Sequence, residues 1–292
     1  MLVAGFVLAV SFIALAVMLN SVIYTENLAT RGEDARGSEA IAYRADMVAG
    51  TEQLIEHANE NEAMFADRRD LLKTSIESMD DGTAPIAAID GIRTETELMS
   101  TTQGTLIGQF NASRNFTNVG GDPDWELADS IEGTRAFRIN ITDSDELDET
   151  SPFIIRVDDG TDLWRVQIYN QSGTANTTLD VVGGPTCDIG GLEPEIDVVA
   201  GSVDDQECAG YEFASNVSGS YMLEFQDSND IQGNFSVVVN STSYTAGNYN
   251  SDRDSPFADD QAIYAATIHV LHESSAHRYE TDARAVPGEN DA

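Results

Sequence analysis

Residues 2–24 read LVAGFVLAVSFIALAVMLNSVIY, an apolar run without a single charged residue. Its only clearly polar members are Ser11, Asn20 and Ser21. An α-helix needs about 20 apolar residues to cross the core of a bilayer. A helix in a soluble protein rarely stays apolar on every face over such a length. The stretch therefore predicts a transmembrane anchor over residues 1–24, with the long polar remainder of the chain on one side of the membrane.

A cleaved signal peptide is the alternative interpretation of this stretch. Such a peptide usually has a basic n-region, a shorter apolar core and small residues at the cleavage site. No basic residue precedes the apolar run, and no clear Ala-x-Ala site follows it, which favours a retained anchor. Neither flank is rich in lysine or arginine, so the positive-inside rule does not orient the segment.

The excess of acidic over basic residues indicates a protein that works at high ionic strength. The 292 residues include 51 acidic and 15 basic side chains, for a formal net charge of −36, and Lys73 is the only lysine. Hydrophobic residues still make up 41% of the chain, too many for a disordered acidic tail. A fold this charged repels itself at low ionic strength, whereas at molar salt the Debye length falls to roughly 3 Å. The composition therefore favours the protein of a halophile over an ordinary acidic surface protein.

Nucleic acid is excluded as a favoured partner by the same balance. Contacts to phosphates need clustered lysine and arginine side chains, and the chain has no such cluster.

Asn-x-Ser/Thr triplets indicate on which side of the membrane the polar region lies. With 17 Asn and 46 Ser or Thr in the chain, chance would give about three triplets, and eight are present. Some of them can arise by accident in turns rich in Ser, Thr and Asn, but their clustering favours an exported, glycosylated region. The candidate glycosylation sites are Asn111, Asn115, Asn140, Asn170, Asn176, Asn216, Asn234 and Asn240.

The two cysteines give the same orientation. Cys187 and Cys208 flank a stretch rich in Gly, Pro and Asp. Two thiols without nearby histidines fall short of a four-ligand zinc site, so a disulfide is the favoured interpretation. A disulfide implies an oxidising compartment, and closing a loop of this length is worth on the order of 3 kcal/mol. We therefore expect a single-pass protein of the cell membrane, with its N-terminus inside and its C-terminal domain outside.

A helical pattern follows the anchor. Apolar residues recur mainly on one face from Ser38 to Met79, after which Asp80-Asp81-Gly82 and Pro85 are typical of a helix end. A second helix is predicted from about Pro85 to Phe110, antiparallel to the first. The alternative is one continuous rod to residue 80 followed by a loose segment.

From about residue 118 the pattern becomes β. Short runs rich in branched and aromatic residues alternate with Gly, Asn and Asp turns, which is typical of an antiparallel sandwich. The predicted strands are Arg135–Ile141, Phe153–Asp158, Leu163–Tyr169, Asn176–Val182, Tyr221–Gln226, Asn234–Asn240, Ala262–Glu273 and His277–Val286.

The predicted fold class is α+β, with an N-terminal transmembrane helix, a long helix or αα-hairpin stalk and a C-terminal antiparallel β-sandwich-like head. The predicted domains are a transmembrane anchor at 1–24, a juxtamembrane joint at 25–37, a helical stalk at 38–115 and a β-rich extracellular domain at 116–292.

This layout, carried by Leu2–Tyr24, the helix through Met79 and the β region to Val286, resembles type IV pilins and archaellins, and more closely still haloarchaeal membrane proteins of pilin-like layout. The resemblance implies a surface protein whose N-terminal helix packs with other pilin-like subunits, or with copies of itself, in a filament. Gly5 and Phe6 stand where the pilin helix usually carries a glutamate, and no basic leader precedes Met1. Either a leader lies upstream of Met1 or the protein does not polymerise.

Few residues suggest chemistry. His269, His272 and His277 lie close together in sequence, but His269 and His272 should point to opposite faces of a strand, which favours exposed histidines over a zinc site. Acidic clusters around Asp145, Asp159 and Asp230 lack the EF-hand pattern and are typical of solvated loops. No G-x-S-x-G, P-loop or dinucleotide motif occurs.

The sequence therefore predicts a membrane-anchored structural or adhesive surface protein that is not an enzyme and has no cofactor, no metal and the lipid bilayer as its partner. The alternative is a membrane-tethered ligand-binding module with a pocket lined by Trp125, Trp164 or tyrosines, and a tethered hydrolase is a weaker third interpretation.

Overall fold

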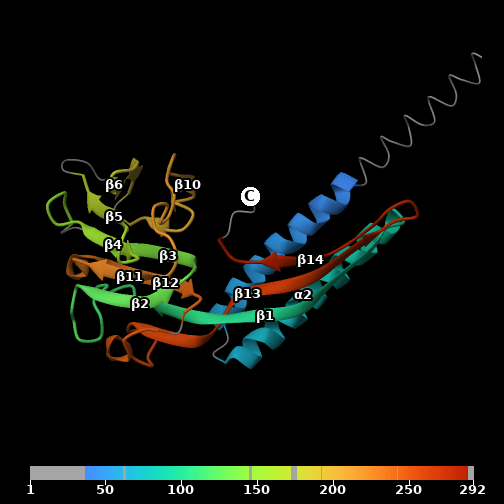
Figure 1. The fold of residues 1–292 in the computed structure, drawn as a ribbon, viewed down its shortest axis with the longest axis horizontal. Helices are drawn as coiled ribbons and strands as arrows, with labels where there is room; N and C mark the ends of the chain where they lie inside the picture. Colours follow the sequence, from blue (N-terminus) through green and yellow to red (C-terminus); the bar gives the residue numbers. More distant parts are fainter. Residues whose placement is uncertain are drawn as a thin grey trace, which may run out of the picture.

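The computed structural model describes residues 37–61, 64–144, 147–171, 176–191, 193–241 and 243–288. The structure is mostly β, with 45% strand and 23% helix. Two helices lie at one end and two packed sheets at the other, and long strands run between the two ends (Figure 1). The predicted anchor at 1–24 lies outside the described residues, as does the predicted joint at 25–37 except for its last residue. None of the described helices is both long and apolar enough to cross a bilayer.

All strand pairings between named strands are antiparallel, and the strands form two sheets. The larger sheet has the order β10 (Gln206–Glu207), β9 (Ser202–Val203), β8 (Glu195–Asp197), β3 (Thr134–Asp143), β12 (Gln232–Val239), β1 (Arg93–Gln109), β13 (Phe257–Glu273) and β14 (Arg278–Ala285). The smaller sheet has the order β2 (Trp125–Ile131), β11 (Tyr221–Gln226), β4 (Phe153–Asp158), β5 (Leu163–Asn170), β6 (Asn176–Val181) and β7 (Thr186–Gly190). Two short 3-10 helices, η1 (Ser228–Asp230) and η2 (Ala246–Asn248), lie in the loops.

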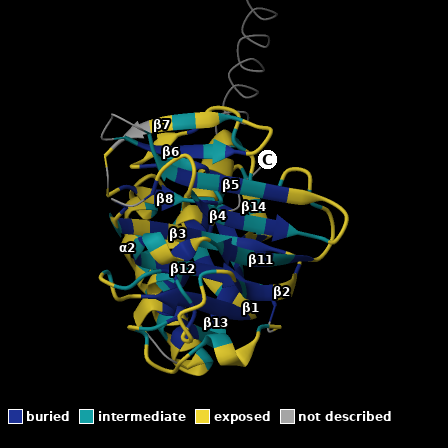
Figure 2. Cartoon of the chain, turned by 90° about the vertical axis from the view of Figure 1, so that its left-hand side faces the viewer, coloured by how far each residue is buried: buried dark blue, intermediate teal, exposed yellow. Residues whose placement is uncertain are grey.

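The main core fills the space between the two sheets. Side chains alternate along each strand, as in β4, where Phe153, Ile155 and Val157 are buried and the residues between them are half-buried. Rings from both sheets meet at the centre, for example Phe225 of β11 and Phe235 of β12, whose centroids lie 5.0 Å apart in an edge-to-face arrangement. Figure 2 looks at this end of the molecule and shows the buried segments of the stacked strands. This part of the chain is a β-sandwich.

Strands β1 and β13 connect the sandwich to the helical end. Each has 17 residues, and they pair from Arg93 opposite Glu273 to Gly108 opposite Phe257. At about 3.3 Å per residue, such a strand spans roughly 55 Å. The pairing register shifts at three places between Leu98 and Leu106. Such bulges bend and twist a strand pair, and these lie where the ribbon passes from the sandwich to the helices.

Two helices cover one face of the ribbon formed by β1, β13 and β14. They are the first helix (residues 37–61) and α2 (Phe65–Ile89). A second core lies between them and the ribbon, and it includes Val48, Ile55, Leu72 and Ile76 from the helices and Ile268 from β13. The helices are antiparallel, because Asn59 of the first contacts Arg68 at the start of α2, while Gly50 lies against Met79 further along α2.

The predicted fold class is wrong in its helical part. The segment expected to form the second stalk helix, Pro85–Phe110, is mostly strand β1, so no helical stalk spans 38–115. Thr94 and Thr96 face the helices and alternate with Glu95 and Glu97, which is a two-residue period. Several β-branched residues also favour strand over helix here.

The predicted break at Asp80–Pro85 is also wrong, because α2 continues through this segment to Ile89 with Pro85 inside it. The chain turns instead at Gly91, which has φ 73°, and the backbone N–H groups of Asp90 and Gly91 donate to carbonyls of the last helical turn. The helical segment from 38 to 79 is in fact interrupted before Phe65. Packing of α2 on β1 and β13 outweighs the unfavourable local preference of Gly82 and Pro85.

The predicted strands agree with the structure better than the predicted helices do. All eight predicted strands are present, and Phe153–Asp158 and Tyr221–Gln226 have the expected bounds. Strand β2 and the short strands β7, β8, β9 and β10 were missed, as was β1.

Two glycines in β1 are required by close approach of neighbouring strands. A Cβ atom at Gly108 would lie 2.7 Å from the backbone oxygen of Phe235, and one at Gly104 would lie 2.6 Å from that of Val239. We expect Gly108→Ala to lower the free energy of unfolding by about 1–3 kcal/mol through this overlap. Gly82→Ala is the matched control. It lies inside α2 with open space around it, so it should raise stability by about 0.5–1 kcal/mol.

Both variants are compared with the wild type by denaturant unfolding in molar salt. A destabilising effect of Gly82→Ala would argue that residues 80–85 form a turn rather than a helix.

Candidate functional site

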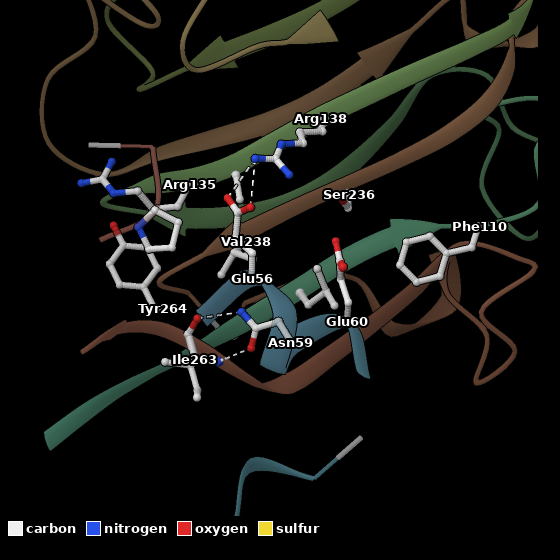
Figure 3. A pocket seen from close by; sticks show the side chains of 13 residues that line it. Glu56, Asn59, Glu60, Phe110, Arg135, Arg138, Ser236, Val238, Ile263 and Tyr264 are labelled. Atoms are coloured by element: carbon white, nitrogen blue, oxygen red, sulfur yellow. Dashed lines mark hydrogen bonds and ion pairs between the residues drawn. The ribbon is translucent and has the colours of Figure 1, made fainter. Parts of the chain in front are cut away.

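A cleft lies where the C-terminal half of the first helix meets the outer face of the larger sheet (Figure 3). The helix contributes Glu56, Asn59 and Glu60, and β3 contributes Arg135 and Arg138. Strands β1, β12 and β13 supply the remaining wall, which includes Leu106, Val238 and Tyr264. Its volume is about 40 Å³, enough for a few water molecules.

Strand β3 carries both arginines of this cleft, and a register shift between them, where Ala136 has φ 46°, brings side chains three positions apart to one face. Phe137 and Ile139 point into the sandwich core, so Arg138 points outward, toward the first helix. The guanidinium carbon of Arg135 lies 5.6 Å from the centre of the Tyr264 ring. This is a cation–π contact between β3 and β13 across the larger sheet.

An ion pair joins the first helix to the sandwich. Arg138 Nη2 lies 2.9 Å from Glu56 Oε2 and 3.1 Å from Glu56 Oε1. Burial raises the pKa of the Glu56 carboxyl above its ordinary value of 4.5, and the nearby carboxylates of Glu60 and Asp197 raise it further, while Arg138 opposes both effects. Removing one partner of such a pair would leave the other charge partly buried without a counter-charge.

The amide of Asn59 fixes the helix to β13. Its Nδ2 donates to the Ile263 carbonyl at 2.9 Å, and its Oδ1 accepts from the Ile263 backbone N–H at 2.8 Å (Figure 3). The β14 partner of β13 reaches only to Ala266, so Asn59 satisfies backbone groups beyond the end of that pairing. Buried backbone groups need such partners, and this side chain acts like one further residue of a strand.

A buried arginine fixes the other helix. Arg68 is fully buried at the start of α2, and its Nη2 donates to Asp259 Oδ2 of β13 at 2.7 Å and to the Asn59 carbonyl at 3.3 Å. Nearby, Arg253 lies over the rings of Phe110 and Phe257 and donates to the Glu60 carbonyl at 3.2 Å. Both helices are thus attached by charged and polar groups to strands that continue into the sandwich.

The geometry suits a rigid junction better than a catalytic centre. The charges of Glu56 and Arg138 neutralise each other, and the amide of Asn59 is consumed by β13. Within the residues that the structure describes, no group of His, Cys, Asp or Glu side chains is placed to hold a metal ion. The arrangement fixes the helical end to the strands of the larger sheet through hydrogen bonds and paired charges.

The predicted disulfide is confirmed. Cys187 in β7 is bonded to Cys208, with 5.8 Å between their Cα atoms. Because β7 is the outer strand of the smaller sheet and Cys208 directly follows β10, the outer strand of the larger one, the bond joins the two sheets at one edge of the sandwich.

The eight sequon asparagines differ in what their side chains do. Asn111, Asn140 and Asn216 are exposed, although Asn216 Nδ2 donates to the Leu163 carbonyl. Asn240 is half-buried, and its Oδ1 accepts from the backbone N–H groups of Glu132 and Gly133. The others, also half-buried, are Asn115, Asn170, Asn176 and Asn234.

The two tryptophans expected to line a ligand pocket lie in the core instead, whereas Tyr264 lines the junction cleft. Trp125 is 5% exposed and donates from Nε1 to the Phe116 carbonyl, and Trp164 is 3% exposed among other rings. The expectation that all three clustered histidines are exposed is wrong, because His272 is buried on the helix-facing side of β13 and the other two are half-buried. His269 does point to the opposite face, where it contacts Asp282 at 2.8 Å.

No family model, curated protein or solved structure matches this chain. The junction residues Glu56, Asn59, Arg68 and Arg138 were not singled out from the sequence. The one available signal was the scarcity of basic residues, because in a chain with 15 bases against 51 acids an arginine next to an apolar stripe is a candidate for a structural ion pair.

The raised pKa of Glu56 has a consequence for stability. A carboxyl whose pKa is higher in the folded than in the unfolded state weakens the fold as the pH rises from about its ordinary value of 4.5 through the folded value. The stability of Glu56→Gln relative to the wild type should therefore increase between pH 4.5 and neutrality.

Thermal unfolding of both proteins in molar salt at several pH values measures this difference. In an Arg138→Gln background the increase should be larger, because Arg138 lowers the Glu56 pKa. A relative stability that is flat, or that decreases with pH, would contradict the assignment.

Glycan occupancy should follow exposure. The transferase must reach Nδ2 of the asparagine, so we expect Asn111 and Asn140 to be modified before Asn240. Asn240→Gln should also reduce stability by about 1–3 kcal/mol, because two backbone N–H groups lose their acceptor, whereas Asn111→Gln should change it by less than about 0.5 kcal/mol. Mass spectrometry of glycopeptides from the native host measures the occupancy of each sequon, and denaturant unfolding measures the stability of the two variants. Full occupancy at Asn240 alone would contradict the expected order.

Proposed function

We propose that the chain is an exported structural or adhesive protein of the cell surface of a halophilic archaeon. The observation that carries the proposal is the Cys187–Cys208 disulfide, which uses both cysteines of the chain. Disulfides persist in oxidising compartments outside the cytoplasm and are rare inside it. The cluster of eight sequons in the same region supports export independently.

The arrangement of the chain supports a role in holding the sandwich away from the cell surface. The sandwich carries the disulfide and most of the sequons, and it lies at the end opposite residue 37, where the described chain begins (Figure 1). The continuous strands β1 and β13 and the paired charges of the junction hold the two ends in a fixed relation. A protein built this way can hold its sandwich away from the surface to which its N-terminal part is attached.

Attachment to the cell membrane is the part of the proposal that depends on residues 2–24, which lie outside the described residues. Their uncharged, apolar sequence supports a preference for the lipid bilayer, with the N-terminus on the inner side. Self-association through this segment, as the resemblance to pilins implies, would make the protein a filament subunit or minor pilin.

External protease tests the proposed location. The chain is expressed in a halophilic host with a C-terminal tag, and intact cells in isotonic brine are treated with a salt-tolerant protease. We expect the tag to be lost from intact cells while a cytoplasmic marker survives, and we expect deletion of residues 2–24 to remove the protein from the membrane fraction. A tag that survives until the cells are lysed, or free thiols at both cysteines, would refute export.

Deletion of the gene distinguishes a filament subunit from a surface protein that acts singly. Cells without the protein should adhere less to a solid surface, and the wild-type gene should restore adhesion. Electron microscopy of the surface then distinguishes a filament subunit, whose filaments disappear, from a protein that acts singly. Unchanged adhesion together with an unchanged cell surface would contradict both versions.

A further inference from the structure

A second hollow lies at the far end of the helical layer, away from the junction cleft. Its floor is the cross-strand pair Thr94 of β1 and His272 of β13. The first helix forms one wall, and the last turns of α2 form the other. The groove has a volume of about 360 Å³, within the range of sites for small organic molecules and about nine times that of the junction cleft.

Two buried polar atoms on the floor have no partner among the described residues. They are Thr94 Oγ1 and His272 Nδ1, and the side chains that carry them belong to residues only 7% and 4% exposed. A buried polar atom left without a hydrogen bond usually costs free energy, so native proteins keep few of them. Two such atoms side by side at the bottom of a groove are the pattern expected of a site that is completed by a ligand.

The packing explains why this pair is left unsatisfied. One step further along the ribbon, the hydroxyl of Thr96 is 3.1 Å from the Tyr43 hydroxyl of the first helix. The Tyr43 ring also lies against the His272 ring, with 5.8 Å between centroids and 48° between planes. Tyr43 thus packs on the floor beside His272, and its hydroxyl pairs with Thr96 rather than with Thr94 or His272.

The walls and the rim define the chemistry of the occupant. Apolar side chains line the walls, including Met47, Ile92 and the largely exposed Ile86. Carboxylates from Glu39, Asp46 and Asp90 surround the opening, and no lysine or arginine of the described ranges lines it. An acidic opening favours a cation, and apolar walls favour a ligand with a hydrocarbon body.

We propose that this groove binds a small organic cation, in which an ammonium or guanidinium group is carried on an apolar body. The N–H groups of the cation donate to Thr94 Oγ1 and to His272 Nδ1 of a neutral imidazole protonated on Nε2. The apolar body lies against Met47, Ile86 and Ile92, and the rim carboxylates balance the charge. This proposal is independent of the proposed surface function, because the groove and the sandwich lie at opposite ends of the molecule.

Three probes of similar shape test the class of ligand. They are phenethylamine as the cation, 2-phenylethanol as its neutral counterpart and 3-phenylpropionate as the anion, each titrated by calorimetry into the full chain in molar potassium chloride. We expect phenethylamine to bind at least tenfold more tightly than the other two. Nitrogen-15 NMR of the histidine rings should show a shift at His272 on binding and none at His277.

Variants test the floor and the rim separately. Thr94→Val and His272→Phe should each weaken phenethylamine binding at least tenfold, and Asp46→Asn with Asp90→Asn should weaken it several-fold, more so at lower salt. His277→Phe is the matched control, since this histidine lies in the same β13–β14 hairpin but does not line the groove, and it should leave binding unchanged.

Thr94→Val also separates a binding role from a structural one. Because the hydroxyl has no protein partner among the described residues, its replacement should keep or raise the melting temperature of the ligand-free protein while binding is lost. A lower melting temperature would show that the hydroxyl already has a structural partner, and it would overturn the assignment. Three other results would overturn the proposal as well. The first is equal binding of the alcohol and the amine, and the second is no binding of any probe at millimolar concentration. The third is a crystal structure, obtained with the amine present, that has only water on the floor of the groove.

Discussion

The full-length pairing of β1 with β13 is the constraint on which the rest of the structure depends. The two strands contribute to both hydrophobic cores, with Ile107 in the sandwich core and Ile268 in the core beneath the helices. A slip of the register by one residue would reverse the face of every side chain and empty both cores together. The junction, the groove and the orientation of the sandwich relative to the helices all depend on this single ribbon.

Polar groups then fix how the helices lie on that ribbon. Asn59 and Arg68 bind β13 from the two helices, and Glu56 binds Arg138 of β3. Each contact lies at the border between the two cores, where an apolar contact would allow the layers to slide. Directional hydrogen bonds and ion pairs define one position, although the desolvation of the Glu56 carboxylate opposes folding. At the far end of the same ribbon, Thr94 Oγ1 and His272 Nδ1 have no such partner among the described residues, and this is where the proposed organic cation would bind.

The β region was predictable because its information is local. The alternation in Phe153–Asp158 and in Tyr221–Gln226, with Gly, Asn and Asp turns around them, identifies strands without any knowledge of their neighbours. The segment 93–109 failed for the opposite reason. Gly104 and Gly108 disfavour a helix in this segment, and in the structure they are the places where Val239 and Phe235 approach the strand too closely for a side chain. The boundary of α2 failed likewise, because packing on β1 outweighs Gly82 and Pro85.

The sequence by itself determined the excess of acidic residues, the two-residue alternation of most strands and the presence of a pair of cysteines free to bond with each other. These depend on composition and on neighbours along the chain. Only the tertiary structure decided that β1 is a strand, that Glu56 meets Arg138, and that Thr94 and His272 share the floor of a groove. Those contacts join residues 82 and 178 positions apart (138 − 56 and 272 − 94), and nothing local in the sequence specifies which distant strand or helix will supply the partner.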